Sequence, residues 1–164
     1  MVSAASTSVP LATRAPFRVD LGREAVAVTV DGVVPAWLRG RLVRTAPAVF
    51  AQGSWQAEHW FDALGMVYGF TIDDDGIGFV QRQLASDTAR DPARSTGFGT
   101  PMARSRWQRL LHPVPAGTDN TNVNILALGD DLVAFTETDR QWVIDPTTLH
   151  AVRPLAWQDG VAQS

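Results

Sequence analysis

The chain has 164 residues, of which 45% are hydrophobic and 19% charged, and its formal net charge at pH 7 is −3. This composition is typical of a globular domain with a sizeable core, and the slight acidity gives no indication of a nucleic-acid surface. The sequence has no cysteine, which excludes disulfides, zinc–thiolate sites and thiol nucleophiles. It also fits a reducing compartment, so we expect a cytoplasmic protein. No run approaches the roughly 18 apolar residues that a membrane span needs.

The N-terminal third of the sequence predicts a leader followed by strands. Residues 1–16 are small and polar without a continuous apolar segment, so we expect a flexible leader and no secretory signal. Residues 24–30 (EAVAVTV) are β-branched, and residues 39–45 (RGRLVRT) alternate polar with apolar side chains; both patterns predict short strands. Pro35 and Pro47 bracket the second segment and disfavour a helix there.

Residues 66–82 give the clearest local signal, which is that of a β-hairpin. Apolar residues alternate on both sides of Asp74-Asp75-Gly76, and this tripeptide supplies the turn. The consecutive aspartates that begin at Asp73 are similar to a calcium loop in composition. A calcium-binding EF-hand, however, needs acidic ligands at alternate positions and a distant glutamate, so we expect no calcium site.

Residues 85–106 are rich in small residues, proline, glycine and arginine, and predict a long loop that leads into a short helix around 107–111. Arg104, Arg106 and Arg109 fit either a phosphate or membrane-surface patch or a solvated face. The solvated face is the commoner origin of such a pattern.

The C-terminal part predicts four short strands in succession, at residues 122–128, 132–138, 140–145 and 149–152. Four close strands of this kind are typical of one propeller blade. Since a four-stranded blade takes about 40 to 50 residues, the chain carries material for about three blades. We therefore expect an all-β fold, and specifically a partial β-propeller.

Five sequence elements in a fixed order resemble the carotenoid cleavage oxygenase family, which includes carotenoid- and stilbene-cleaving dioxygenases and the retinal pigment epithelium isomerase. They are DGVVPAWLRGRLVR (31–44), EHWFD (58–62), NTNVN (120–124), TET (136–138) and DPTTL (145–149). The resemblance covers residues 31–152. Two departures concern glycines: Thr45-Ala46-Pro47 stands where the family usually has Asn-Gly-Pro, and Ala63 stands where it has glycine. Loss of these glycines affects the local turn geometry.

The resemblance implies a seven-bladed propeller with a non-haem Fe(2+) on its axis, held by four histidines, some of which hydrogen-bond to glutamates. Such enzymes use O2 to cleave a conjugated C=C bond of carotenoids, apocarotenoids or stilbenes to carbonyl products. The apolar polyene or stilbene reaches the metal through a tunnel, often from a membrane surface. A peripheral membrane contact is therefore expected, with no transmembrane span and no nucleic-acid partner.

The resemblance also assigns roles to residues. His59, Trp60, Phe61 and Asp62 correspond to a structural motif that enters a blade, and not to metal ligands. Glu137 corresponds to a carboxylate that accepts a hydrogen bond from an iron-bound histidine. Val133 and Phe135 alternate with Glu137, which predicts one shared strand face. No residue of the chain is expected to be catalytic or to bind the metal.

The sequence contains three histidines, at positions 59, 112 and 150, none of which is at a ligand position of the family. The family's first iron ligand is expected beyond Ser164, in an Ala-His-Pro context. Residues 17–164 are therefore expected to form the N-terminal part of a propeller truncated before that ligand, inactive alone and self-associating through open strand edges. The alternative is a non-catalytic β module that binds a protein partner or apolar ligand through its edges and aromatic residues, six of them tryptophan.

Overall fold

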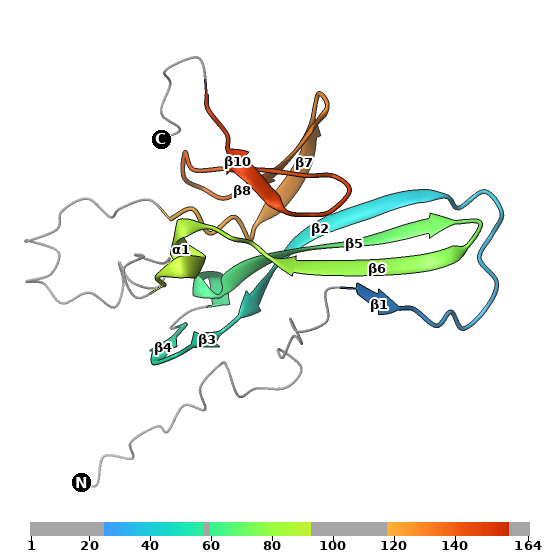
Figure 1. The fold of residues 1–164 in the computed structure, drawn as a ribbon, viewed down its shortest axis with the longest axis horizontal. Helices are drawn as coiled ribbons and strands as arrows, with labels where there is room; N and C mark the ends of the chain where they lie inside the picture. The colour runs from blue at the N-terminus through green and yellow to red at the C-terminus, as the bar shows by residue number, and fades with distance from the viewer. Residues whose placement is uncertain (1–24, 58–59, 93–117, 158–164) are drawn as a thin grey trace, which may run out of the picture.

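A computed structural model describes residues 25–57, 60–92 and 118–157, which form two four-stranded antiparallel sheets and one two-stranded sheet (Figure 1). In the first four-stranded sheet the order is β1-β6-β5-β2, with β1 at Ala25–Ala27, β2 at Gly40–Val49, β5 at Leu64–Asp73 and β6 at Gly76–Gln83. In the second sheet the order is β10-β9-β8-β7, with β7 at Asn124–Leu128, β8 at Asp131–Phe135, β9 at Trp142–Ile144 and β10 at Ala151–Pro154. The small sheet pairs β3 (Ala51–Gln52) with β4 (Trp55–Gln56). No helix among the described residues is long and apolar enough to cross a membrane.

The hairpin expected at 66–82 is confirmed as β5 and β6. Its last cross-strand pair is Asp73 with Gly76, and Gly76 has φ +123°, a conformation that favours glycine. The Asp73 side chain accepts a hydrogen bond of 3.0 Å from the Asp75 backbone N–H, so this carboxylate stabilises the turn. Phe70 and Phe79 lie opposite each other on the paired strands with ring centroids 4.8 Å apart.

The first sheet differs from the sequence prediction at β1 and β2. The described strand β1 covers only Ala25–Ala27, whereas the sequence predicts a strand over residues 24–30. Strand β2 runs through Pro47 to Val49, whereas the sequence pattern predicts a strand that ends before Pro47. Proline is tolerated there because β2 is an edge strand that pairs only with β5, and the register shifts directly after Pro47.

A short helix, α1 (Asp87–Arg90), interrupts the segment for which the sequence predicts a loop. Its N-cap is the buried Ser86, whose Oγ accepts a hydrogen bond of 3.1 Å from the Ala89 backbone N–H. The helix predicted around 107–111, the arginines at 104, 106 and 109, and the leader 1–16 lie outside the described residues.

The four strands predicted between 122 and 152 are confirmed as one four-stranded sheet, although each differs from its expected bounds by one to three residues at one or both ends. The all-β class is confirmed as well. The length of the whole chain predicts about three blades. The described residues, which are only part of that length, form two four-stranded sheets besides the β3–β4 pair.

The hydrophobic core lies between the two four-stranded sheets. Val67 lies on β5, and Leu84 directly follows β6. They form one cluster with Ala134 and Ile144 of the second sheet and with Leu149, between β9 and β10, and all five side chains are almost fully buried. Burying a side chain such as Leu149 contributes about 1.5–3 kcal/mol. Apolar contact therefore contributes to holding the two sheets together.

The turn at 145–149 fixes the second sheet onto the first. Asp145 Oδ1 accepts hydrogen bonds from the Thr147 N–H at 2.9 Å and from the Thr148 N–H at 2.6 Å. Hydrogen bonds from Thr148 and Thr147 hold the pKa of the Asp145 carboxyl below its ordinary value. Arg41 and Arg82 of the first sheet donate to the carbonyls of this turn at 2.8 and 2.5 Å.

Candidate functional site

The structural-motif residues lie directly before β5. Trp60, Phe61 and Asp62 form a 3₁₀ turn, while His59 lies outside the described residues. Trp60 is half-buried against Phe50, with ring centroids 5.1 Å apart, and Asp62 is buried. Phe61 is 46% exposed, so it lies at the surface of this part of the chain instead of in a core.

Two asparagines of the Asn-x-Asn element hold this segment in place. The Asn120 side chain accepts from the Gly65 backbone N–H at 2.7 Å and donates to the Ala63 carbonyl at 2.8 Å. The Asn122 amide donates to the carbonyls of Phe61 and Ala63 at 3.0 and 2.9 Å. Both asparagines are buried, so each side chain takes the place of water as a partner for these backbone groups. We call these four hydrogen bonds the asparagine clamp.

The backbone conformation explains how the chain accommodates its departure from the family at Ala63. Ala63 is completely buried, and Leu149 is the one described non-glycine residue with positive φ, so no glycine is needed at 63. Gly65 is constrained instead. A Cβ added there would lie 3.3 Å from Asn120 Oδ1 and 3.3 Å from Asn122 Cβ, closer than the clamp tolerates without moving.

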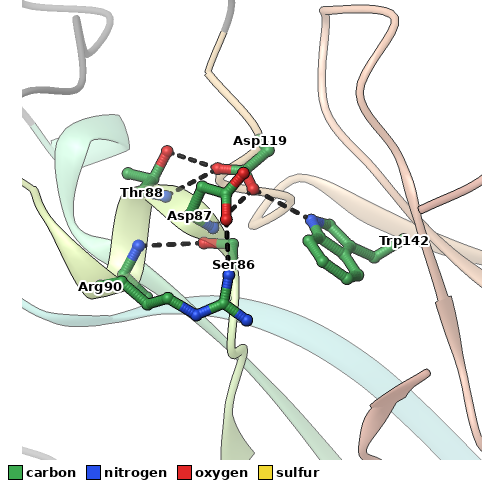
Figure 2. A network of polar contacts seen from close by, with 7 residues as sticks. Ser86, Asp87, Thr88, Arg90, Asp119 and Trp142 are labelled. Carbon is green, nitrogen blue, oxygen red and sulfur yellow. Dashed lines mark hydrogen bonds and ion pairs between the residues drawn. The ribbon is translucent and has the colours of Figure 1, made fainter. Parts of the chain in front are cut away.

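Asp119, directly before the clamp, connects helix α1 to the second sheet (Figure 2). Its carboxylate accepts from the Asp87 N–H at 2.7 Å, from the Thr88 N–H at 2.9 Å, from the Thr88 hydroxyl at 2.5 Å and from the Trp142 indole N–H at 3.3 Å. Burial raises the pKa of Asp119, but the hydrogen bonds from Thr88, Asp87 and Trp142 outweigh it and hold the pKa below its ordinary value. The carboxylate is therefore an ionised, buried anchor.

Sequence reasoning missed Asp119. Its partners on α1 are 31 and 32 residues away, and no local pattern pairs them. The available signals were Ser86 followed by Asp87-Thr88, which is a helix start, and an aspartate directly before the Asn-x-Asn element.

Glu137 lies in a bend directly after β8 and is exposed. The expected strand face shared by Val133, Phe135 and Glu137 is wrong, because β8 ends at Phe135 and, of the three, only Val133 is fully buried. Both neighbours of Glu137 make side-chain hydrogen bonds. Thr136 Oγ1 donates to Glu137 Oε2 at 3.2 Å, and Thr138 Oγ1 donates to the Thr118 carbonyl at 2.6 Å. The bend that carries Glu137 is thus attached to the segment that carries Asp119.

Thr121, between the two clamp asparagines, is 1% exposed, and its hydroxyl has no hydrogen-bond partner. Among the described residues, Thr121 Oγ1 is the one buried side-chain nitrogen or oxygen atom without a hydrogen-bond partner. Leaving a buried hydroxyl without a partner costs about 1–3 kcal/mol.

The residues that the structure describes do not form an iron site. The described part of the chain holds no group of three histidine, cysteine, aspartate or glutamate side chains that converge on a metal position. His150 is exposed, and the histidines at 59 and 112 lie outside the described residues. Through their hydrogen bonds, residues 118–122 form a polar scaffold that orders the backbone at 61–65 and contacts the Glu137 bend.

A family model described as RPE65, retinal pigment epithelial membrane protein, matches residues 15–164. The chain belongs to this family. The rat β,β-carotene 15,15'-dioxygenase (Rattus norvegicus) is 33% identical over 153 residues, which cover 85% of this chain and 27% of that protein. The resemblance to carotenoid cleavage oxygenases is thereby confirmed.

Solved structures show the same fold. A mutant of Synechocystis apocarotenoid oxygenase superposes with a TM-score of 0.65 at 20% identity, over 90% of this chain and 32% of that one. A cobalt-substituted form of the Synechocystis protein gives a TM-score of 0.57 at 22% identity, over 74% of this chain and 26% of that one. The described sheets are therefore part of a carotenoid-oxygenase β-propeller, and that relative is a metal-containing protein. The chain spans about a quarter to a third of the length of the relatives it matches.

Proposed function

We propose that this chain supplies the N-terminal part of a propeller that cleaves a conjugated C=C bond of a carotenoid, apocarotenoid or stilbene. The observation that carries the proposal is the junction at 118–122. Three separate family elements, at 58–62, 120–124 and 136–138, meet there through the asparagine clamp and the Thr138–Thr118 hydrogen bond. The 33% identity to a β,β-carotene 15,15'-dioxygenase supports the substrate class.

In this proposal the reaction adds O2 to the C=C bond, so that each alkene carbon becomes a carbonyl carbon. Fe(2+) supplies the O2 chemistry in the complete protein, and its histidine ligands are contributed outside this chain. The described residues of the chain bind neither metal nor O2 and act as scaffold, so the chain alone is expected to be inactive. We place this function in the cytoplasm, a reducing compartment that is compatible with the cysteine-free sequence.

Glu137 is the chain's own contribution near the metal in this proposal. Its carboxylate accepts a hydrogen bond from the free ring N–H of a metal-bound histidine, which fixes the orientation of that imidazole. Two features of the structure support this role: Glu137 is exposed, and its bend is anchored to Thr118 through Thr138. A glutamate on a fixed bend positions a partner better than one on a free loop.

A chimera tests the proposal. Residues 15–164 replace the matching segment of the rat dioxygenase, and β-carotene cleavage and bound iron are measured. We expect cleavage to carbonyl products, and we expect Glu137→Gln to lower metal affinity or activity about 10- to 100-fold. The matched control is Asp139→Asn, an exposed carboxylate two residues away, which should leave both unchanged. Equal effects of the two substitutions would contradict the role of Glu137, and a folded but inactive chimera with full iron would contradict the function.

A further inference from the structure

Gln141, directly before β9, is a buried glutamine whose amide joins two segments of the chain. Its side chain is 1% exposed. Its Nε2 donates to the Thr138 carbonyl at 2.5 Å, and its Oε1 accepts from the Trp157 indole N–H at 2.7 Å. A carbonyl can only accept and an indole N–H can only donate, so one orientation of the amide satisfies both partners and the flipped one satisfies neither. We call these two hydrogen bonds the glutamine bridge.

One end of the glutamine bridge is the bend that carries Glu137. Thr138 follows Glu137 directly, and its two oxygen atoms are held by different segments. Its carbonyl accepts from Gln141, while its hydroxyl donates to the Thr118 carbonyl at 2.6 Å. Because one planar peptide unit joins Glu137 to Thr138, these contacts also restrict the backbone of Glu137. The position of Glu137 therefore depends on Gln141 as well as on Thr118.

The other end of the glutamine bridge is the segment 155–157, by which the chain leaves the second sheet after β10. The Leu155 N–H donates to the Gln141 backbone carbonyl at 2.9 Å, so Gln141 holds this segment at Leu155 and again at Trp157. Every partner in the bridge is a residue of this chain. The link between the bend and the segment therefore does not require a neighbouring blade.

We propose that Gln141 is a positioning residue for Glu137, because its amide joins the Glu137 bend to the segment by which the chain leaves the second sheet. This inference rests on the role proposed above for Glu137. The histidine that Glu137 orients in that role is expected beyond Ser164, so the segment 155–157 leads toward it along the chain. The glutamine bridge keeps the carboxylate in place relative to this segment. Gln141 acts only through Glu137 and contacts neither substrate nor metal.

The chimera of residues 15–164 with the rat dioxygenase tests the proposal, with the dissociation constant of iron as the readout. Gln141→Met keeps an unbranched side chain and removes both the donor and the acceptor. We expect it to raise the dissociation constant about 3- to 10-fold, less than the 10- to 100-fold expected for Glu137→Gln. In the Glu137→Gln background Gln141→Met should have no further effect, because its influence passes through the carboxylate.

Val143→Ala is the matched control for a loss of stability alone. Val143 is 4% exposed on β9, and its truncation weakens the same sheet while both hydrogen bonds of the glutamine bridge remain. It should leave the dissociation constant of iron unchanged. If Glu137→Gln acts but Gln141→Met does not, or if the two effects multiply in the double variant, the positioning role is overturned and the role of Glu137 stands. If Glu137→Gln itself has no effect, the proposed role of Glu137 fails, and the positioning role fails with it.

Hydrogen exchange of the 164-residue chain, measured by mass spectrometry without metal, tests the bridge from its far end. Trp157→Phe removes the indole donor and leaves Gln141 in place. We expect exchange of the backbone amides at 136–141 to become at least about threefold faster. Trp55→Phe, the same change on β4, is the control and should leave these amides unchanged. Equal exchange at 136–141 in the two variants would overturn the proposal.

Discussion

Replacing Asp119 with asparagine should break the connection between helix α1 and the second sheet. Each carboxylate oxygen of Asp119 accepts two hydrogen bonds: Oδ1 from the N–H and hydroxyl of Thr88, and Oδ2 from the Asp87 N–H and the Trp142 indole. An amide nitrogen cannot accept. With the nitrogen at the Oδ2 position, the Asp87 N–H and the Trp142 indole lose their acceptor; with the nitrogen at the Oδ1 position, the Thr88 N–H loses its acceptor, whereas the Thr88 hydroxyl can rotate to accept from the amide.

The expected destabilisation follows from that count. Hydrogen bonds to a charged group contribute about 1.5–3 kcal/mol each, and part of the loss is offset because the neutral amide costs less to bury. We expect Asp119→Asn to lower the free energy of unfolding by about 2–4 kcal/mol at pH 7. Urea unfolding followed by tryptophan fluorescence measures this change. The exposed Asp139→Asn serves as control and should change stability by less than about 0.5 kcal/mol.

The pH dependence gives the same prediction a second, independent readout. The folded-state pKa of Asp119 lies below its unfolded value, so its stabilisation is present above the unfolded pKa of about 3.9 and is lost as pH falls through the folded pKa. The stability difference between wild type and Asp119→Asn should be constant from about pH 5 to 8 and should shrink below about pH 4. A difference under about 0.5 kcal/mol at pH 7, or one that grows in acid, would refute the assignment of an ionised anchor.

Three further substitutions test the surroundings of this anchor by the same unfolding assay. Asn120→Ala removes the side-chain partners of the Gly65 N–H and Ala63 carbonyl and should cost about 2–3 kcal/mol; a loss below about 1 kcal/mol would mean that water replaces the side chain. Gly65→Ala should cost about 1–3 kcal/mol because its Cβ would crowd Asn120 and Asn122, and an unchanged midpoint would show that the clamp moves freely. Thr121→Val removes the unpartnered hydroxyl and should be neutral or stabilising by up to about 1 kcal/mol, whereas destabilisation would reveal a partner for that hydroxyl.

The local parts of the fold were predictable from the sequence. The β5–β6 hairpin follows from strict alternation around Asp74-Asp75-Gly76, and the second sheet follows from its short strands and turns. Both signals depend on residues that are neighbours in the chain. The continuation of β2 through Pro47 was not predictable in this way, because it depends on which strand becomes the edge of the sheet.

The site depends on contacts between distant segments, and those contacts are not visible in a local pattern. The partners of Asn120 lie 55 and 57 residues away, and those of Asp119 on α1 lie about half as far. The family elements identified which segments matter, but only the structure shows that residues 61–65, 118–122 and 136–138 meet. The position of Glu137 was missed for a related reason: strand alternation was extended past Phe135, where pairing with β7 has already ended.

The central claim is that this chain contributes a propeller scaffold and no complete metal site. The most direct test is the iron content of the purified 164-residue chain by elemental analysis, after anaerobic loading with Fe(2+) and desalting. The account predicts iron far below one atom per chain, with the rat dioxygenase treated in parallel as the positive control. Near-stoichiometric iron in the chain would contradict the account, because it would mean that residues of this chain, alone or in an oligomer, complete a metal site.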